Sequence, residues 1–339
     1  TWTETEFGVE KGRWAIIQRA LYGLKSSGAA WRAHLAQTMY DLKFQSRKAD
    51  PDVWFRPATK KDGSKYYEYV LIYVDDILTV SDCPKDVMET LSGLYRLKED
   101  PTTGKTYDRP RRYLGADIGH YHFDDDVKKP RWFMSADIYV KEAIKTCEEH
   151  LDSQGLKLKT KVSATLPSGY RPELDISEEL NDKGANQFQE LIGILRWLIE
   201  LGQIDIATPV AMLSSFLALP RRGHLEAVYH IFAYLKLHSR SKIVFDDANI
   251  DWENGKFTDA DWSDFYPDAK EDLPPNAPEL RGGLVQINCF VDADHAGNKV
   301  TRRSHSGILI YLNSAPIDWF SKRQNTVESS SFIALRIAT

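Results

Sequence analysis

Apolar residues recur along the chain with two different periods, which predict alternating helices and strands. Trp31, Leu35, Met39 and Leu42 lie three or four positions apart and therefore share one helical face. Similar spacing predicts helices at 85–95, 135–147 with Ser135 as N-cap, 188–199, 225–235 and 332–337. Short runs rich in β-branched residues predict a hairpin over 66–81 and strands over 113–120, 285–291, 306–311 and 316–320. Polar stretches at 151–185 and 251–283 are interpreted as a linker and a loop.

The hairpin carries the strongest chemical signal. Tyr73, Val74, Asp75 and Asp76 stand between the apolar runs 69–72 and 77–80, which predicts a strand, a tight Asp-Asp turn and a strand. Neighbouring carboxylates repel each other, and a cation between them relieves the repulsion. Hard oxygen ligands favour magnesium, and paired metal ions are the usual device for phosphoryl transfer between nucleotides. The alternative is an ordinary acidic turn, because Asp is common in turns.

Composition indicates a globular protein without selecting its partner. The 339 residues are 42% hydrophobic and 12% aromatic, enough for two or three domains with a sizeable core. No apolar run has the length of a membrane span, and no secretory pattern stands at the start, where Thr1 in place of Met is interpreted as a fragment boundary. Widely spaced Cys83, Cys147 and Cys289 predict reduced structural thiols. The net charge of −5 is unusual for a nucleic-acid binder, although basic clusters occur at 157–161, 221–222, 302–303 and 322–323.

Several short blocks resemble one known family in collinear order. They are LYGLKSSG at 21–28 with Trp31 after it, DPDVWF at 50–55, YVDD at 73–76, YLG at 113–115, ELIG at 190–193 with RWL at 196–198, the segment 204–236, VDADHAG at 291–297, TRRS at 301–304 and SKRQ at 321–324. This series resembles the Pol polyprotein of copia-type long-terminal-repeat retrotransposons, over its reverse transcriptase and ribonuclease H regions. The resemblance covers nearly the whole chain.

The resemblance implies an α+β fold, with a right-hand reverse-transcriptase palm and thumb, a helical connection and a partial ribonuclease H-like α/β domain. The expected divisions are a partial reverse transcriptase over 1–150, a linker and connection over 151–250, a loop insertion over 251–284 and the ribonuclease H-like part over 285–339. The implied activity is RNA-directed DNA synthesis with Mg²⁺ (or Mn²⁺). The implied partners are an RNA/DNA template-primer hybrid, deoxynucleoside triphosphates and other parts of the polyprotein, with no membrane. A cytoplasmic location in virus-like particles, or a nuclear one, is expected, without secretion.

The family's functional positions transfer onto matching residues. Asp75, Asp76 and Asp292 match metal-binding catalytic aspartates. The other matches are Tyr22, Gly23, Lys25 and Gly28 in the block lining the nucleotide pocket, Tyr73 and Val74 beside the template-primer, and Tyr113, Leu114 and Gly115 in the primer grip. Gly28 makes physical sense there, because a residue without Cβ allows close approach of a base pair or sugar. Asp294 is expected to be an outer or surface group and His295 a structural residue.

Two departures from the family pattern predict lost activity. The family supplies a further Asp from a strand upstream of LYGLK, whereas Glu4, Glu6 and Glu10 are the acids that precede Leu21 here. Ser331 stands where the family's ribonuclease H helix carries its metal-binding Glu. The chain alone is therefore expected neither to polymerise nor to cleave RNA.

Two other readings remain. A non-catalytic nucleic-acid-binding module would bind a hybrid through its phosphates with strong salt dependence. A metal-dependent hydrolase built on Asp75 and Asp76 is disfavoured, because the ordered blocks would then be a coincidence.

Overall fold

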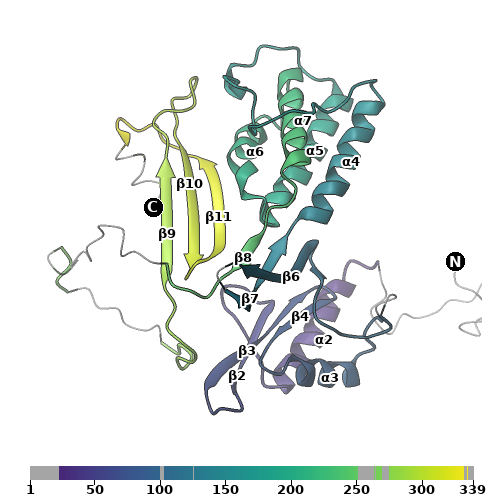
Figure 1. The fold of residues 1–339 in the computed structure, drawn as a ribbon, viewed down its shortest axis with the longest axis vertical. Helices are drawn as coiled ribbons and strands as arrows, with labels where there is room; N and C mark the ends of the chain where they lie inside the picture. Colours follow the sequence, from purple (N-terminus) through teal and green to yellow (C-terminus); the bar gives the residue numbers. More distant parts are fainter. Residues whose placement is uncertain are drawn as a thin grey trace, which may run out of the picture. The chain divides into compact units, whose positions relative to one another are not determined.

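The computed structural model describes residues 23–99, 103–124, 126–250, 263, 265–268, 275–331 and 334. The chain divides into two compact units, the first comprising 1–108 and 276–282 and the second 109–275 and 283–339. Both mix helices with antiparallel sheets (Figure 1), which is the coarser part of the expected α+β class. Within the described residues, no helix is both long and apolar enough to cross a membrane.

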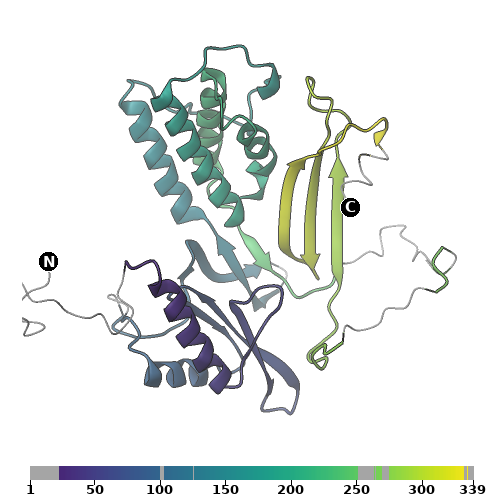
Figure 2. The same cartoon turned by 180° about the vertical axis from the view of Figure 1, so that it is seen from behind.

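The first unit is built on a four-stranded antiparallel sheet with strand order β1-β2-β3-β4. Its strands are β1 (Gln45–Ser46), β2 (Val53–Thr59), β3 (Lys65–Tyr73) and β4 (Asp76–Val80), and its helices are α2 (Ser27–Asp41) and α3 (Pro84–Leu94). Figure 2 shows both helices on one face of this sheet. Alternate residues of β3 are buried, as expected for a strand with one face on a core. Leu35, Met39, Val87 and Leu91 of the helices form a hydrophobic cluster with Val70 of β3.

The core of the second unit consists of four helices. They are α4 (Asp137–Asp152), α5 (Asp182–Glu200), α6 (Ala207–Ser214) and α7 (Arg222–Leu237), with 3₁₀ turns at Pro172–Leu174 and Ile204–Ile206. Phe188, Leu195, Phe232 and Cys147 are fully buried in this core. The expected helices at 135–147, 188–199 and 225–235 are therefore confirmed, because their apolar stripes face one another.

Two antiparallel sheets complete the second unit. One has the order β5-β6-β7-β8, from β5 (Arg112–Tyr113), β6 (Ala116–Phe123), β7 (Asp126–Ser135) and β8 (Ile243–Phe245). The other has the order β11-β10-β9, from β9 (Ile287–Ala293), β10 (His305–Leu312) and β11 (Ala315–Arg323). The indole N–H of Trp319 on β11 donates to the carbonyl of Ile199 on α5 at 2.9 Å, so the second sheet is tied to the helices.

Several sequence expectations need correction. Ser135 ends β7, and the N-cap of α4 is Ala136; the Ser135 hydroxyl donates to the carbonyl of Ser241 and accepts from the amide of Asp137, the first residue of α4, at 3.3 Å. The single strand expected over 113–120 is two strands, β5 and β6, separated by a tight turn. β11 is longer than the short strand expected at 316–320. Apart from residue 334, the helix expected at 332–337 lies outside the described residues.

Candidate functional site

The acidic hairpin has a different turn from the one expected. Tyr73 pairs with Asp76 across β3 and β4, so the two central residues of the turn are Val74 and Asp75. Asp76 is already the first residue of β4. The expectation of an Asp-Asp turn is wrong by one residue, because the strand pairing sets the register. The two carboxylates therefore stand on a turn residue and on the adjoining strand residue.

Val74 adopts an unusual backbone conformation. Its φ is +57°, whereas Asp75 has no positive φ. A positive φ at the first central residue alone is the pattern of a type II′ hairpin turn, which prefers glycine there. A β-branched residue in this region is a genuine outlier, and such conformations cost about 1–3 kcal/mol unless the surrounding structure holds them. The tip of the hairpin is thus under local strain.

The carboxylates of Asp75 and Asp76 are exposed. In the part of the chain that the structure describes, neither accepts a hydrogen bond or forms an ion pair. Free, exposed carboxylate oxygens suit a hard divalent cation, which is bound through oxygen ligands. The described residues bring no third His, Cys, Asp or Glu into a metal-binding group with this pair. The carboxylates of Asp75 and Asp76 are therefore ligands of the type that a divalent cation prefers, and they supply part of the ligands that it needs.

Three of the sequence blocks meet at this hairpin. The indole Nε1 of Trp31 on α2 donates to the carbonyl of Val74 at 2.8 Å. The next residue, Arg32, forms an ion pair with Asp52 at 2.9 Å, and the Asp52 carbonyl accepts from the amide of Ile72 at 3.0 Å. The LYGLK…W, DPD and YVDD blocks, separate in sequence, are therefore joined around β3.

The nucleotide-pocket residues expected from the sequence lie just before and within the start of α2. Gly23 has a φ of +93° in a turn, Lys25 is exposed, and Gly28 stands in the first turn of the helix. Apart from its chain neighbours and the backbone of its own helix, no described residue comes within 4 Å of a Cβ built on Gly28. Tyr22 lies outside the described residues.

The segment expected as a primer grip forms a second tight turn, in the second unit. Tyr113 pairs with Ala116, and Leu114 and Gly115 between them have φ values of +49° and +89°. Two positive φ values in succession define a type I′ turn, which favours Asn-Gly. A Cβ at Gly115 would lie 3.5 Å from Nε1 of Trp197 on α5, so this turn packs against that helix.

Replacing Leu114 by asparagine is expected to stabilise the second unit. Asn tolerates the left-handed region far better than Leu, so the free energy of unfolding should rise by about 0.5–1 kcal/mol. Urea denaturation would measure the change, with Leu219→Asn, at an exposed position without positive φ, as the matched control. A fall in stability of Leu114→Asn would show that packing of the half-buried Leu114 outweighs backbone strain.

Asp292, the expected aspartate of the ribonuclease H-like part, lies exposed on β9 opposite Gly307 of β10. Its carboxylate accepts from the amide of Ala293. Asp294 instead accepts from the amides of His305 and Gly297, at 2.8 and 3.2 Å, and a Cβ at Gly297 would overlap its carboxylate. Asp294 therefore stabilises the backbone of its own loop through these hydrogen bonds.

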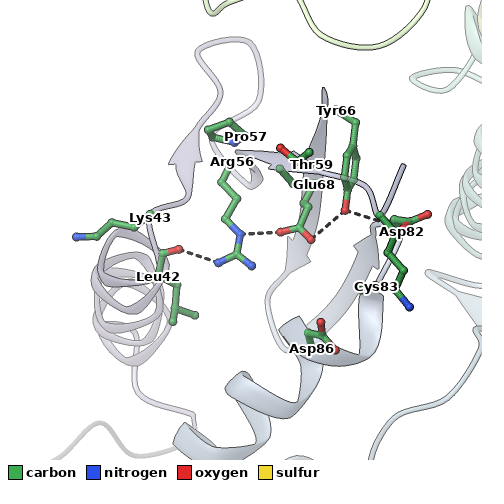
Figure 3. Close-up of a pocket in the computed structure, with 12 residues that line it drawn as sticks. Leu42, Lys43, Arg56, Pro57, Thr59, Tyr66, Glu68, Asp82, Cys83 and Asp86 are labelled. Atoms are coloured by element: carbon green, nitrogen blue, oxygen red, sulfur yellow. Dashed lines mark hydrogen bonds and ion pairs between the residues drawn. The ribbon is translucent and has the colours of Figure 1, made fainter. Parts of the chain in front are cut away.

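The sheet β1–β4 of the first unit contains a buried ion pair. Glu68 on β3 is 7% exposed, and Arg56 on β2 donates to it at 2.6 Å. Figure 3 shows the pair beside a hollow of about 430 Å³, with Tyr66 approaching the same carboxylate. Burial opposes ionisation of Glu68, but hydrogen bonds from Ser81, Arg56 and Tyr66 together hold its pKa below the usual value. Because these partners already satisfy the charge of Glu68, this carboxylate is not available to a ligand in the hollow, which Lys43, Lys61, Asp82 and Asp86 also line.

The chain is similar in sequence to several retrotransposon proteins. The chain is 22% identical over 315 residues to the Retrovirus-related Pol polyprotein from transposon RE1 of Arabidopsis thaliana, covering 93% of this chain and 17% of that protein. It is 24% identical over 306 residues to the Putative transposon Ty5-1 protein YCL074W of Saccharomyces cerevisiae, covering 89% and 80%. It is 25% identical over 323 residues to the Retrovirus-related Pol polyprotein from transposon TNT 1-94 of Nicotiana tabacum, covering 95% and 20%.

These relatives confirm the resemblance drawn from the sequence blocks. The chain is similar to copia-type retrotransposon Pol polyproteins over about nine tenths of its length, and it spans about a fifth of the length of the RE1 and TNT 1-94 polyproteins. No protein-family model and no solved structure matches it. The roles of individual residues therefore stay predictions.

Sequence reasoning missed two features of the site. The sequence predicts Trp31 as an apolar helix position and as part of the LYGLK…W block, but not that its N–H donates to a carbonyl 43 residues away. The Arg56–Glu68 pair was missed as well, although Glu68 stands at an alternate, inward-facing position of an apolar strand, which is a readable signal.

Proposed function

We propose that this chain is the reverse transcriptase and ribonuclease H region of a retrotransposon Pol polyprotein, and that the β3–β4 hairpin carries metal ligands for nucleotidyl transfer. One observation carries the proposal: three blocks shared with the family meet around a hairpin whose two carboxylates have no partner among the described residues. The relationship to Pol polyproteins over 89–95% of this chain supports the same conclusion.

In this proposal, Asp75 and Asp76 hold Mg²⁺ (or Mn²⁺) through their carboxylate oxygens. The bound metal would neutralise charge on the triphosphate of the incoming deoxynucleotide. Lys25 supplies a further positive charge for phosphate, and Gly23 and Gly28 leave room for the nucleotide. Tyr73 and Val74 flank the carboxylates, on the side of the turn assigned to the template-primer hybrid.

The sheet β1–β4 and its two helices would then be part of the palm, and the helices of the second unit the thumb and connection. Leu114 and Gly115, which form a tight turn, and the adjoining Tyr113 would grip the primer backbone. The sheet β9–β11 is assigned to the ribonuclease H-like part, with Asp292 as its metal-binding residue. Among the described residues, Asp292 is not part of a group of three or more His, Cys, Asp or Glu side chains that could hold a metal ion.

The described part of the hairpin site supplies two carboxylates, fewer than the ligands that a divalent cation requires. The remaining ligands would come from water, from the triphosphate and from residues outside the described ranges. An incomplete protein ligand set weakens metal binding and transition-state stabilisation together. Metal binding is therefore the first property to measure, before turnover.

The wild-type chain is expected to bind Mn²⁺, and Asp75→Asn/Asp76→Asn is expected to weaken this binding by about 100-fold, because both anionic ligands are lost. Mn²⁺ titration by electron paramagnetic resonance measures the affinity. Asp82→Asn, an exposed neutralisation just after β4, is the matched control and should retain the wild-type affinity. Equal Mn²⁺ affinities in wild type and the double variant would overturn the metal assignment.

RNA-templated primer extension with Mg²⁺ belongs beside this titration. Extension by wild type and not by Asp75→Asn/Asp76→Asn would show that further ligands complete the site. Salt-sensitive binding of an RNA/DNA hybrid, unaffected by the double variant and without any metal affinity, would favour a non-catalytic nucleic-acid-binding module instead.

A further inference from the structure

The hydrogen bond from Trp31 to Val74 holds the peptide that leads into Asp75. The carbonyl of Val74 and the amide of Asp75 belong to one planar peptide unit. A donor fixed on that carbonyl therefore fixes the orientation of the whole unit, and with it the direction in which Asp75 leaves the backbone. The bond joins α2 to the tip of the β3–β4 hairpin at 2.8 Å.

The conformation of this hairpin tip has to be stabilised by residues outside the hairpin. Val74 has a φ of +57°, which glycine adopts freely and valine avoids. Its side chain is 65% exposed, so burial of that side chain does little to keep the residue in place. Across the turn, pairing of Tyr73 with Asp76 closes the strands but leaves the Val74 carbonyl outside the ladder. Among the described residues, the indole N–H of Trp31 is the hydrogen-bond donor to that carbonyl.

Trp31 is itself fixed by its neighbours. Its ring meets Tyr95 edge to face, with centroids 5.4 Å apart, and Tyr95 follows the last residue of α3. Tyr95 also contacts the ring of His34, and its hydroxyl shares a hydrogen bond with Thr38 of α2. The indole ring of Trp31 is thus packed against Tyr95 at the end of α3, and Tyr95 is in turn bonded to α2. These contacts hold the indole N–H in place, as a residue that positions a site requires.

We propose that Trp31 is a positioning residue of the candidate metal site: its indole N–H fixes the Val74–Asp75 peptide and so sets the carboxylates of Asp75 and Asp76 for a divalent cation. The inference rests on the proposed function, because it assigns Trp31 a role in that same site. Residues that orient metal ligands through hydrogen bonds, without contacting the metal, typically change metal affinity by about 10–100-fold when they are altered.

Trp31→Phe removes the N–H and keeps an aromatic ring against Tyr95, so it isolates the hydrogen bond. Trp54→Phe is the matched control: Trp54 is 5% exposed in the same unit and packs against Tyr40, away from the turn. Mn²⁺ affinity is expected to fall about tenfold in Trp31→Phe. It should remain at the wild-type value in Trp54→Phe, even if that variant is less stable.

A rescue variant separates positioning from general stability. Glycine at position 74 adopts the positive φ without support, so Trp31→Phe/Val74→Gly should regain most of the lost affinity. Wild-type Mn²⁺ affinity in Trp31→Phe would overturn the proposal, and so would an equal loss of affinity in Trp54→Phe. Failure of rescue with normal stability would assign Trp31 to packing alone and would equally overturn it.

Hydrogen exchange gives a readout that does not depend on the metal. Amides of the 73–76 turn should exchange faster in Trp31→Phe than in wild type, while those of α3 should be unchanged. If wild type binds no Mn²⁺ but the turn still loses protection, the proposed metal function fails while the support by Trp31 is established. Unchanged exchange at the turn would refute that support.

Discussion

Replacing Arg56 by methionine is expected to lower the free energy of unfolding of the first unit by about 3 kcal/mol at pH 7. The reason is the charge left behind: Glu68 is 7% exposed, and Arg56 provides its 2.6 Å ion pair. Removing one partner of a buried pair typically costs about 3–5 kcal/mol, because the other charge stays buried without compensation. Hydrogen bonds from Ser81 and Tyr66 remain and place the expected loss at the lower end.

The loss should shrink in acid. In wild type the pKa of Glu68 is held below its ordinary value of 4.5, so its contribution to stability is present above that pH and is lost as pH falls through the lowered pKa. Without Arg56, burial dominates and favours the protonated form of Glu68. Urea denaturation at pH 7 and pH 4 should therefore show a smaller difference between wild type and Arg56→Met at pH 4.

Arg32→Met is the matched control for this experiment. Arg32 also pairs with a carboxylate through Nε, at 2.9 Å to Asp52, but its side chain is 60% exposed and that of Asp52 is 50% exposed. Exposed pairs contribute about 0–1 kcal/mol, because water screens them. Equal losses in the two variants would contradict the view that burial makes the Arg56–Glu68 pair important.

The sequence predicted helices better than strands, for a physical reason. Helices α2, α5 and α7 each bury one continuous apolar stripe, and the 3.6-residue period makes such stripes visible. The sequence does not predict strands β2 and β7, because each contains a proline and at least one charged residue that interrupts the alternation of apolar and polar positions. Their pairing with distant partners, not their local pattern, makes them strands.

The candidate site shows the same limit. The residue types of the hairpin predict a metal site, but the propensity of Asp for turns placed the expected turn one residue too late. Strand register put Val74 at the strained position, against its own preference. The bond that steadies it comes from Trp31, 43 residues away, and no local pattern encodes such a contact.

Phe188→Ala is expected to cost the second unit about 4 kcal/mol. Phe188 on α5 has no exposed surface and belongs to the cluster that α4, α5 and α7 share. Truncating a buried phenylalanine removes its apolar contacts and leaves a cavity, at a typical cost of about 3–5 kcal/mol. Phe320→Ala on β11 is the matched control: the residue is 45% exposed, so the loss should stay below about 1 kcal/mol.

The two units have separate hydrophobic clusters. Phe188→Ala and Arg56→Met should therefore destabilise different parts of the chain. Hydrogen exchange followed by mass spectrometry in increasing urea reports each unit by its own peptides. Phe188→Ala should lower the midpoint of peptides from α4, α5 and α7 and leave those of β2 and β3 unchanged, while Arg56→Met should do the reverse. A common midpoint that both variants shift would show one cooperative folding unit, and the hairpin site would then depend on the helical core for its stability.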